Sequence, residues 1–361
     1  MTGSEKTYNS RDVSSQAEGG FSDLEEKVLN RLQRDIPLTP RLFDIPAAEA
    51  GVSPEDLLSA VRSLRERGVV RNISAVLDAG RLGYQTSLVA LEVREEDVDE
   101  AAGIINAHPG VSHNYLRDHR YNIWFTLAVE GGDSLDSTAA FIAARCRARD
   151  YLLLRNRRLF KIGLRLPVGR TEESAETQAQ AQPAAAGEAG TLSPADREAL
   201  RLLQRDLPLA ERPLAVLVRE GDSFLSEELL AATGEDLKAR GIIRRYAGVL
   251  RHRDAGYRAN AMTVWKPGPE TDIESAAGRF ARVGAVSHLY LRDVYPGRWE
   301  YPLFAMIHAR SEEELEGLIR SLARETGIGD YLVLRSLREF KKQRVRYFSE
   351  EFSKWKRNNH D

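Results

Sequence analysis

The chain has 361 residues, of which 42% are apolar and 29% charged, with a formal net charge of −2 at pH 7. This length and composition are typical of a globular protein of roughly two to four domains. The near-neutral charge excludes a general attraction to polyphosphates or anionic lipids, and no stretch approaches the ~18 apolar residues of a membrane span. Cys146 is the sole cysteine, which excludes an internal disulfide. The polar N-terminal segment has no apolar signal region, so we expect a cytoplasmic protein without membrane partners.

The first half begins with a helical pattern and then changes to an alternating one. Ser53 is a suitable capping residue and Pro54 suits a first helical position. Helices are predicted at residues 21–34, 47–50, 54–67, 97–107 and 135–149. Strands are predicted at residues 84–93, 111–118, 121–129 and 151–162. This order predicts a winged helix-turn-helix-like unit followed by a ferredoxin-like βαββαβ domain.

The second half repeats the first. "LQRDIPL" around Gln33 returns as "LQRDLPL" around Gln204, and "DYLLLRNRRLFK" from Asp150 returns as "DYLVLRSLREFK" from Asp330. The offset grows only from 171 to 180 residues between these two pairs, so the chain is an α+β tandem repeat of one domain pair. We predict helix-turn-helix-like units at 21–75 and 193–247, ferredoxin-like domains at 76–166 and 248–346, a flexible linker at 167–192, and a C-terminal tail at 347–361.

One motif returns almost letter for letter, as "VSHNYLRD" at 111–118 and "VSHLYLRD" at 286–293. Alternate residues of a strand share one face. The residues expected on one face are Val111, His113, Tyr115 and Arg117 in the first copy, and Val286, His288, Tyr290 and Arg292 in the second. The opposite face carries Leu116, Leu289 and Leu291, which should pack beneath helices. We therefore expect the two halves to meet as an internal pseudo-dimer through their His-Tyr-Arg faces, which form either a pocket or a purely structural polar network.

The second half also carries cations and aromatic residues that the first half lacks. The segment "LRHRDAGYRANAMTVW" contains Arg251, His252, Arg253, Tyr257 and Trp265, and "YPGRWEY" contains Arg298 and Trp299. For the tryptophans the alternative is ordinary core packing, and for His252 it is a solvated loop. If these residues bind a ligand, the pocket is asymmetric and belongs mainly to the second half.

The domain order resembles that of the Lrp/AsnC regulators, in which a helix-turn-helix unit precedes a ferredoxin-like ligand-sensing domain. A DNA-reading helix needs Lys, Arg, Asn or Gln toward the groove. Arg62, Arg65 and Arg67 keep that function open for the first copy. The corresponding helix of the second copy is acid-rich, with Glu227, Glu228, Glu235 and Asp236. A ligand-responsive DNA-binding regulator is therefore the alternative function, and we expect no DNA partner.

Several separated phrases are similar to the siroheme decarboxylases, which are Lrp/AsnC-like proteins of the haem d1 and alternative haem pathways. "GVSHNYLRDHRYNIWFTL" resembles one subunit type of that family, and "RRYAGVLRHRDAGYRANAMTVW" resembles the other. A fusion of the two types would explain the unlike halves. The resemblance implies that siroheme is converted to 12,18-didecarboxysiroheme by loss of two acetate carboxylates, with no cofactor beyond the iron-tetrapyrrole itself.

The candidate residues suit a macrocycle that is ringed by carboxylates. Arginine forks bind carboxylates, aromatic side chains cover a flat ring, and histidine can deliver a proton to the carbon that loses carbon dioxide. We assign catalysis to His252, His288 and Arg251, and either histidine could instead coordinate the iron. We assign substrate binding to Arg253, Tyr257, Trp265, Tyr290, Arg292, Arg298, Trp299, His113, Tyr115, Arg117 and Arg120. An inert tetrapyrrole-binding protein is a third reading, and the sequence leaves open whether fused chains associate further.

Overall fold

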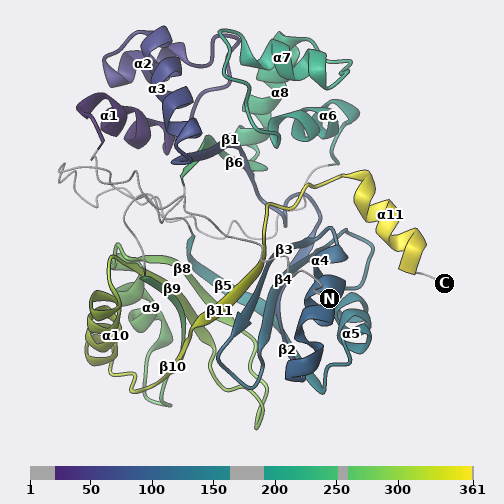
Figure 1. Cartoon of the computed structure of the whole chain (residues 1–361), viewed down its shortest axis with the longest axis vertical. Helices are drawn as coiled ribbons and strands as arrows, with labels where there is room; N and C mark the ends of the chain where they lie inside the picture. Colours follow the sequence, from purple (N-terminus) through teal and green to yellow (C-terminus); the bar gives the residue numbers. More distant parts are fainter. Residues whose placement is uncertain (1–20, 163–190, 251–258, 360–361) are drawn as a thin grey trace, which may run out of the picture.

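The computed structural model describes residues 21–162, 191–250 and 259–359. Within these residues the chain forms two layers, with a helical layer and a two-stranded ribbon above a nine-stranded sheet system (Figure 1). The predicted linker at 167–192 lies outside the described residues except for its last two positions. No described helix is long and apolar enough to cross a membrane.

The helical layer contains the two helix-turn-helix-like units. The first unit has α1 (Asp23–Leu32), α2 (Asp44–Ala50) and α3 (Pro54–Glu66), and the second has α6 (Pro194–Leu203), α7 (Pro213–Glu220) and α8 (Glu227–Ala239). Ser53 caps α3 by accepting a hydrogen bond from the Asp56 amide, as its position predicted. Buried residues of both units form one continuous apolar core, so the units are fused into a single layer.

An antiparallel ribbon forms the floor of this layer. It pairs β1 (Val70–Leu77) with β6 (Ile243–Leu250), one strand from each half. Ile73 and Tyr246 point into the helical core and are fully buried. Neither strand was predicted from the sequence, because each lies where the helical unit passes into the sheet domain and pairs with a strand distant in the chain.

Each half contributes a ferredoxin-like unit to the lower layer. The first consists of β2 (Gln85–Glu92), η1 (Glu95–Asp97), α4 (Val98–Ala107), β3 (Val111–Arg117), β4 (Ile123–Val129), α5 (Leu135–Arg145) and β5 (Asp150–Ile162). The second consists of β7 (Ala259–Lys266), α9 (Ile273–Arg282), β8 (Val286–Arg292), β9 (Leu303–Ala309), α10 (Glu312–Thr326), β10 (Asp330–Leu334) and β11 (Ser336–Lys342). The helices cover the outer faces of the sheets, and a separate apolar cluster fills the space between the inner faces.

The last strand of each half crosses into the other half. The first part of β5 pairs with β2, and from Asn156 onward β5 pairs with β8 of the second half. The reciprocal crossing occurs at Arg335, since β10 pairs with β7 whereas β11 pairs with β3 of the first half. The expected internal pseudo-dimer is therefore confirmed, and strand exchange holds it together in addition to face-to-face packing.

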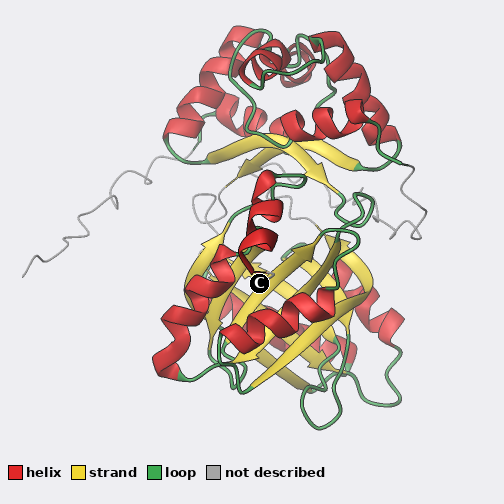
Figure 2. Cartoon of the chain, turned by 90° about the vertical axis from the view of Figure 1, so that its right-hand side faces the viewer, coloured by secondary structure: helices red, strands yellow, loops and turns green. Residues whose placement is uncertain are grey.

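The C-terminal segment is more than a tail. Residues Glu350–Asn359 form α11, which lies beside the first ferredoxin-like unit near the ribbon (Figures 1 and 2). Phe352 is 2% exposed and joins the helical core. The Trp355 ring lies 4.3 Å from the His108 ring, and Lys356 forms ion pairs with Glu130 and Asp133. The segment predicted as a C-terminal tail thus contains a packed helix, and the contacts that stabilise it come from residues more than 200 positions away.

The arginines that could have supported DNA reading are used inside the helical layer. The Arg62 guanidinium donates to the Leu209 carbonyl at 3.0 Å, and Arg65 donates to Asp206 at 3.0 Å, both in the second unit. Arg67 forms an ion pair with Glu25 of its own unit. The helix that would enter a DNA groove is therefore held against the other half through its positive side chains.

We accordingly predict that the chain does not bind DNA specifically, because turning these arginines toward a DNA groove would break the contacts that they make within the helical layer. A gel-shift or anisotropy titration at physiological salt should show only weak, sequence-independent association. Nanomolar binding that depends on sequence would contradict this interpretation.

His108 makes the stability of the fold dependent on pH. Its imidazole is 3% exposed under α11, and burial, with help from Lys341 and Lys356, lowers its pKa to about 4. In the unfolded chain the pKa is about 6.5, so between these values the unfolded state binds more protons. Stability from the neutral imidazole is complete above about pH 6.5 and is lost as the pH falls toward 4.

We predict that His108→Asn, which keeps an acceptor for the Gly110 amide, loses less unfolding free energy than the parent chain between pH 6.5 and 4. At pH 7 the variant should be less stable by about 1–2 kcal/mol, because it lacks the ring that contacts Trp355. Denaturant titrations at several pH values measure both effects. Parallel pH profiles for parent and variant would show that His108 does not titrate with unfolding.

Candidate functional site

The His-Tyr-Arg rows lie on the inner faces of the sheets, but their valines do not. Register shifts interrupt β3 between Val111 and Asn114, and β8 between Val286 and His288. These β-bulges turn Val111 and Val286 outward into the cores beneath the helices, where both are fully buried. The expectation that the valines share the face of the histidines was therefore wrong, whereas Leu116 and Leu289 pack under helices as expected.

The two arginines of the rows brace the strand crossings. Arg117 Nη1 donates to the Leu334 carbonyl at 2.7 Å, and Arg292 Nη1 donates to the Leu154 carbonyl at 2.8 Å. Leu334 and Leu154 occupy equivalent positions, immediately before each strand passes to the other half. Burial lowers the pKa of each guanidinium to about 10, so both remain charged at neutral pH.

These arginines differ in their access to a ligand. Arg117 is 4% exposed, which separates it from any ligand in the present arrangement, although it was expected to bind substrate. Arg292 is half-buried, and its guanidinium lies 4.7 Å from the centre of the Tyr290 ring. The Nε atoms of both arginines are buried without a hydrogen-bond partner in the part of the chain that the structure describes.

His113 stands at the end of its sheet that is nearest the ribbon. Its Nδ1 lies 2.9 Å from Ser112 Oγ, which lies 2.5 Å from Thr126 Oγ1. Burial lowers the pKa of His113 to about 4, and the positive charges of Lys342 and Arg71 act in the same direction. This imidazole is therefore neutral at physiological pH.

His288 occupies the equivalent place in the second half, with a different set of neighbours. Its Nδ1 lies 2.8 Å from Ser287 Oγ, and that hydroxyl lies 2.9 Å from Nε2 of a second histidine, His308. The centre of the Tyr290 ring lies 6.2 Å from the centre of the His288 ring. His288 and Tyr290 are both half-buried, so each retains a surface that a ligand can reach.

The strand that pairs with each row belongs to the other half of the chain. The residue that stands opposite the tyrosine differs in charge between the two rows. Tyr115 stands opposite Glu339 in the register of β3 and β11, and its hydroxyl donates to Glu339 Oε2 at 3.3 Å. Tyr290 stands opposite Leu159 in the register of β8 and β5. The first row is therefore faced by a carboxylate, and the second by an apolar side chain.

Positive side chains of the ribbon, and Arg344 of the segment between β11 and α11, lie near the rows. Arg71 donates to the Lys342 carbonyl at 2.9 Å, and Arg344 donates to Ser74 Oγ at 2.7 Å. Arg244 forms an ion pair with Asp78 at 2.8 Å and lies close enough to Tyr290 to oppose the burial that raises the pKa of that phenol. Arg71 and Arg244 were not expected from the sequence, because the strands that position them were not predicted.

Several expected site residues cannot be placed or lie elsewhere. Arg251, His252, Arg253 and Tyr257 fall outside the described residues. Trp265 is fully buried on the helix-covered face, where its ring centre lies 5.0 Å from that of Phe280, so the expectation that it lines the site was wrong. Core packing, the alternative considered for this tryptophan, is what the structure shows.

Trp299, Arg298 and Arg120 were also expected to bind the ligand. Trp299 is 2% exposed and fills the core between the sheets beside Trp124, 5.3 Å between ring centres. Arg298 forms an ion pair with Asp150, and Arg120 pairs with Glu92 at 2.6 Å. Both partners are carboxylates of the first half, so the Arg298 pair joins the two halves and the Arg120 pair lies within the first. Neither side chain presents an unpaired cation to a ligand.

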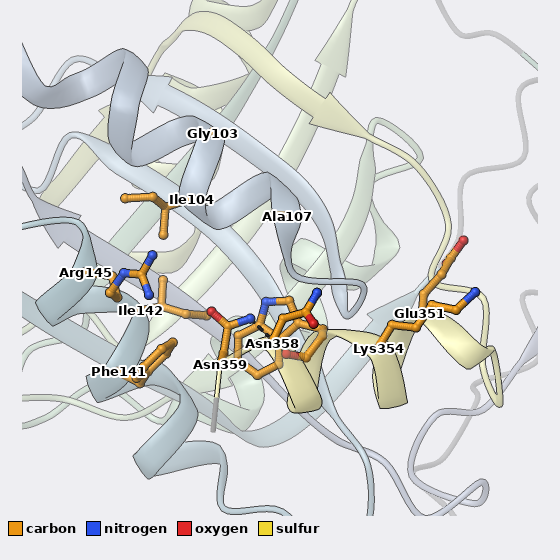
Figure 3. Close-up of a pocket in the computed structure, with 11 residues that line it drawn as sticks. Gly103, Ile104, Ala107, Phe141, Ile142, Arg145, Glu351, Lys354, Asn358 and Asn359 are labelled. Carbon is orange, nitrogen blue, oxygen red and sulfur yellow. Dashed lines mark hydrogen bonds between the residues drawn. The ribbon is translucent and has the colours of Figure 1, made fainter. Parts of the chain in front are cut away.

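A groove of about 550 Å³ lies on the outer side of the first unit, between α4, α5 and α11 (Figure 3). Ile104, Phe141 and Trp355 give it an apolar base, and Arg145 and Lys354 lie at its rim. The first sheet separates it from the inner-face row, because α4 and α5 cover the opposite face of that sheet. It contains none of the residues expected from sequence and is not the candidate site.

Known protein families match both kinds of domain. The family described as AsnC-like ligand binding domain matches residues 81–161 and 254–341. The family described as siroheme decarboxylase NirDL-like HTH domain matches residues 25–71. These matches agree with the predicted tandem of an Lrp/AsnC-type sheet domain and a helix-turn-helix unit.

Similar proteins extend along most of the chain. The siroheme decarboxylase of Hydrogenobacter thermophilus is 40% identical over 91% of this chain and 96% of its own. A crystal structure of the siroheme decarboxylase NirDL in complex with an iron-uroporphyrin III analogue is 34% identical, with a TM-score of 0.71 over 93% of this chain and 98% of that one. The alpha and beta siroheme decarboxylase subunits of Oleidesulfovibrio alaskensis match only 33% and 44% of the chain, at 36% and 34% identity, which fits a fusion of two subunit types. The chain belongs to the siroheme decarboxylase family.

Proposed function

We propose that this chain is a carbon–carbon lyase that removes the carboxyl groups of two acetate side chains from siroheme, giving 12,18-didecarboxysiroheme. The observation that carries the proposal is the half-buried pair His288 and Tyr290 on the inner face of the second sheet, within a chain 40% identical to a siroheme decarboxylase. The relative crystallised with an iron-uroporphyrin III analogue supports a carboxylated iron-tetrapyrrole as the substrate class.

The substrate is a flat ring with many negative charges, and the site offers both kinds of partner. Arg244 and Arg71 on the ribbon, and Arg344 beside it, bring guanidinium groups close to the rows. Such groups bind carboxylates through paired N–H donors. Tyr290 and Leu159 offer ring-sized apolar surface at the second row. We assign the second row and these arginines to substrate binding, together with Arg253 and Tyr257, which lie outside the described residues.

The chemistry that we propose needs a proton donor but no oxidant. The bond between the methylene carbon and the carboxylate breaks, carbon dioxide leaves, and the electron pair stays on that carbon, where the conjugated macrocycle delocalises it. A proton from an imidazole then forms the new C–H bond of the methyl group. Each carboxylate lost therefore consumes one proton, and no organic cofactor takes part.

Two histidines remain candidates for this proton transfer. His288 has the geometry of a donor, with Nδ1 near a hydroxyl and a half-buried ring. His252 is the other candidate, assisted by Arg251, and both residues lie outside the described segments. Whichever histidine does not deliver the proton could coordinate the iron of the substrate, as imidazole does in many haem proteins.

We place the chemistry in the second half because of the side chains that face the rows. Glu339 would set a carboxylate against the carboxylates of a substrate at the first row, and like charges at close range disfavour binding. Leu159 carries no charge at the equivalent position of the second row.

We predict that the purified chain, incubated with siroheme without oxygen, converts it in two steps, each of which removes the mass of one carbon dioxide. Mass spectrometry of the tetrapyrrole distinguishes this from simple binding. A tetrapyrrole that is bound but recovered unchanged would contradict the proposed function.

The histidines should contribute unequally to this reaction. His288→Ala and His252→Ala should each lower turnover by about 10²–10⁴, the usual contribution of a positioned acid, whereas His113→Ala should lower it far less. Single-turnover rates with saturating siroheme measure the difference. If His113→Ala abolished the reaction while the other two variants kept the parental rate, the chemistry would belong to the first half.

The charge of the residue opposite each tyrosine provides a second test of the assignment to the second half. Leu159→Glu would give the second row the carboxylate that the first row already has, so siroheme affinity should fall about tenfold or more. The matched change Glu339→Leu, beside the first row, should leave affinity within about twofold. Titration of siroheme absorbance measures both, and equal effects of the two variants would contradict the assignment to the second half.

A further inference from the structure

We infer that Ser287 and His308 form a proton relay that resupplies His288. The inference rests on the proposed role of His288 as a proton donor. Ser287 Oγ lies 2.8 Å from His288 Nδ1 and 2.9 Å from His308 Nε2, so one hydroxyl bridges two imidazoles. A hydroxyl can accept one hydrogen bond while it donates another, which allows a proton to pass through it.

The bridge is held in place by buried neighbours. Ser287 is fully buried in β8, and His308 is 7% exposed in the adjacent strand β9. The His308 amide donates to the Ala285 carbonyl at 2.9 Å, which fixes the two strands beside each other at this point. A competing acceptor for the hydroxyl, the Met306 carbonyl, lies farther away at 3.4 Å.

The first half has the serine but lacks the second histidine. Ser112 Oγ lies 2.9 Å from His113 Nδ1, as in the second half, but its other neighbour is Thr126 Oγ1. The position of His308 is occupied there by Ala128, whose amide makes the equivalent bond to the Gly110 carbonyl at 2.9 Å. The two-imidazole chain is therefore specific to the half in which we place the chemistry.

The relay balances the proton that each decarboxylation consumes. His288 gives its Nε2 hydrogen to the methylene carbon, Nδ1 takes the hydroxyl hydrogen of Ser287, and the serine oxygen takes a hydrogen from His308 Nε2. His308 then regains a proton from water. One C–H bond forms for each N–H bond broken at His288. The O–H bond of Ser287 and the N–H bond of His308 are broken and formed again. No electron donor is needed. Because two carboxylates leave, His288 must be recharged at least once for each substrate, and a half-turn of its ring between the two losses turns the new N–H bond toward the substrate.

The test separates proton transfer from simple positioning. His308→Gln keeps an N–H donor at the place of Nε2, so it can hold Ser287 but cannot pass a proton. Ser287→Ala removes the bridge. We expect single-turnover decarboxylation to fall about 10- to 100-fold in both variants while siroheme affinity stays within about twofold. Ser112→Ala is the matched first-half change and should affect the rate far less.

A solvent isotope experiment adds a measurement that would not change if Ser287 and His308 only held His288 in position. In mixtures of light and heavy water the parent rate should depend on deuterium content along a curve, because several protons move together, and His308→Gln should straighten that curve. Parental rates and a parental curve in both variants, in a parent chain that decarboxylates siroheme, would overturn the relay alone. A parent chain that does not decarboxylate siroheme would instead overturn the proposed function. Circular dichroism and unfolding curves identify any variant that is misfolded, and for such a variant His308→Asn takes its place.

Discussion

The exchange of the last strands between the halves is the constraint on which the rest of the structure depends. β5 leaves its own sheet after Arg155 and continues beside β8, and the second half crosses back at Arg335. Arg117 and Arg292 hold the backbone at the two crossings through the Leu334 and Leu154 carbonyls. Separating the halves would break both ladders and leave buried guanidinium groups without acceptors, which is costly in a low-dielectric interior. The two halves therefore form one structural unit.

Because the strands are exchanged, each site contains residues from both halves of the chain. The row that carries His288 belongs to the second half, but Leu159, which stands opposite Tyr290, belongs to the first. The row that carries His113 belongs to the first half, and its facing carboxylate Glu339 belongs to the second. A change in the last strand of one half therefore alters the pocket of the other. After duplication, two nearly identical motifs can thus acquire different chemistry without any change in the motifs themselves.

The sequence predicted those parts of the fold that depend on local pattern. The helices and strands of both ferredoxin-like units follow from periodicity, and the repeat itself indicated an internal pseudo-dimer. The valines of the two rows were placed on the wrong face, because a β-bulge changes the alternation by one residue and leaves no mark in composition. The ribbon strands and α11 were missed for a different reason. Ile73 and Phe352 are stabilised by contacts distant in sequence, and no local pattern encodes those contacts.

The same distinction applies to the candidate site. The duplicated His-Tyr-Arg motif was found because it is repeated, and the structure places His113, Tyr115, His288 and Tyr290 on inner faces with partial exposure. Trp265 and Trp299 were assigned by residue type alone, and both are core residues. Ser287 and His308 were not predicted as site residues, since the serine occurs in both copies and the histidine lies in an apolar strand. Their relation to His288 becomes visible only when β8 and β9 are paired.

The helix-turn-helix units are joined to each other through the side chains that a DNA-reading helix would need. A dimeric reader needs two recognition helices that are exposed and spaced by about one turn of DNA. In this chain the two units share one core, and Arg62, Arg65 and Lys238 contact the opposite unit through Leu209, Asp206 and Asp35. The same fusion fixes the ribbon, because β1 and β6 can pair only when the units are joined. Since Arg71 and Arg244 are held on that ribbon, the contacts that join the two helix-turn-helix units also position positive charge near the His-Tyr-Arg rows.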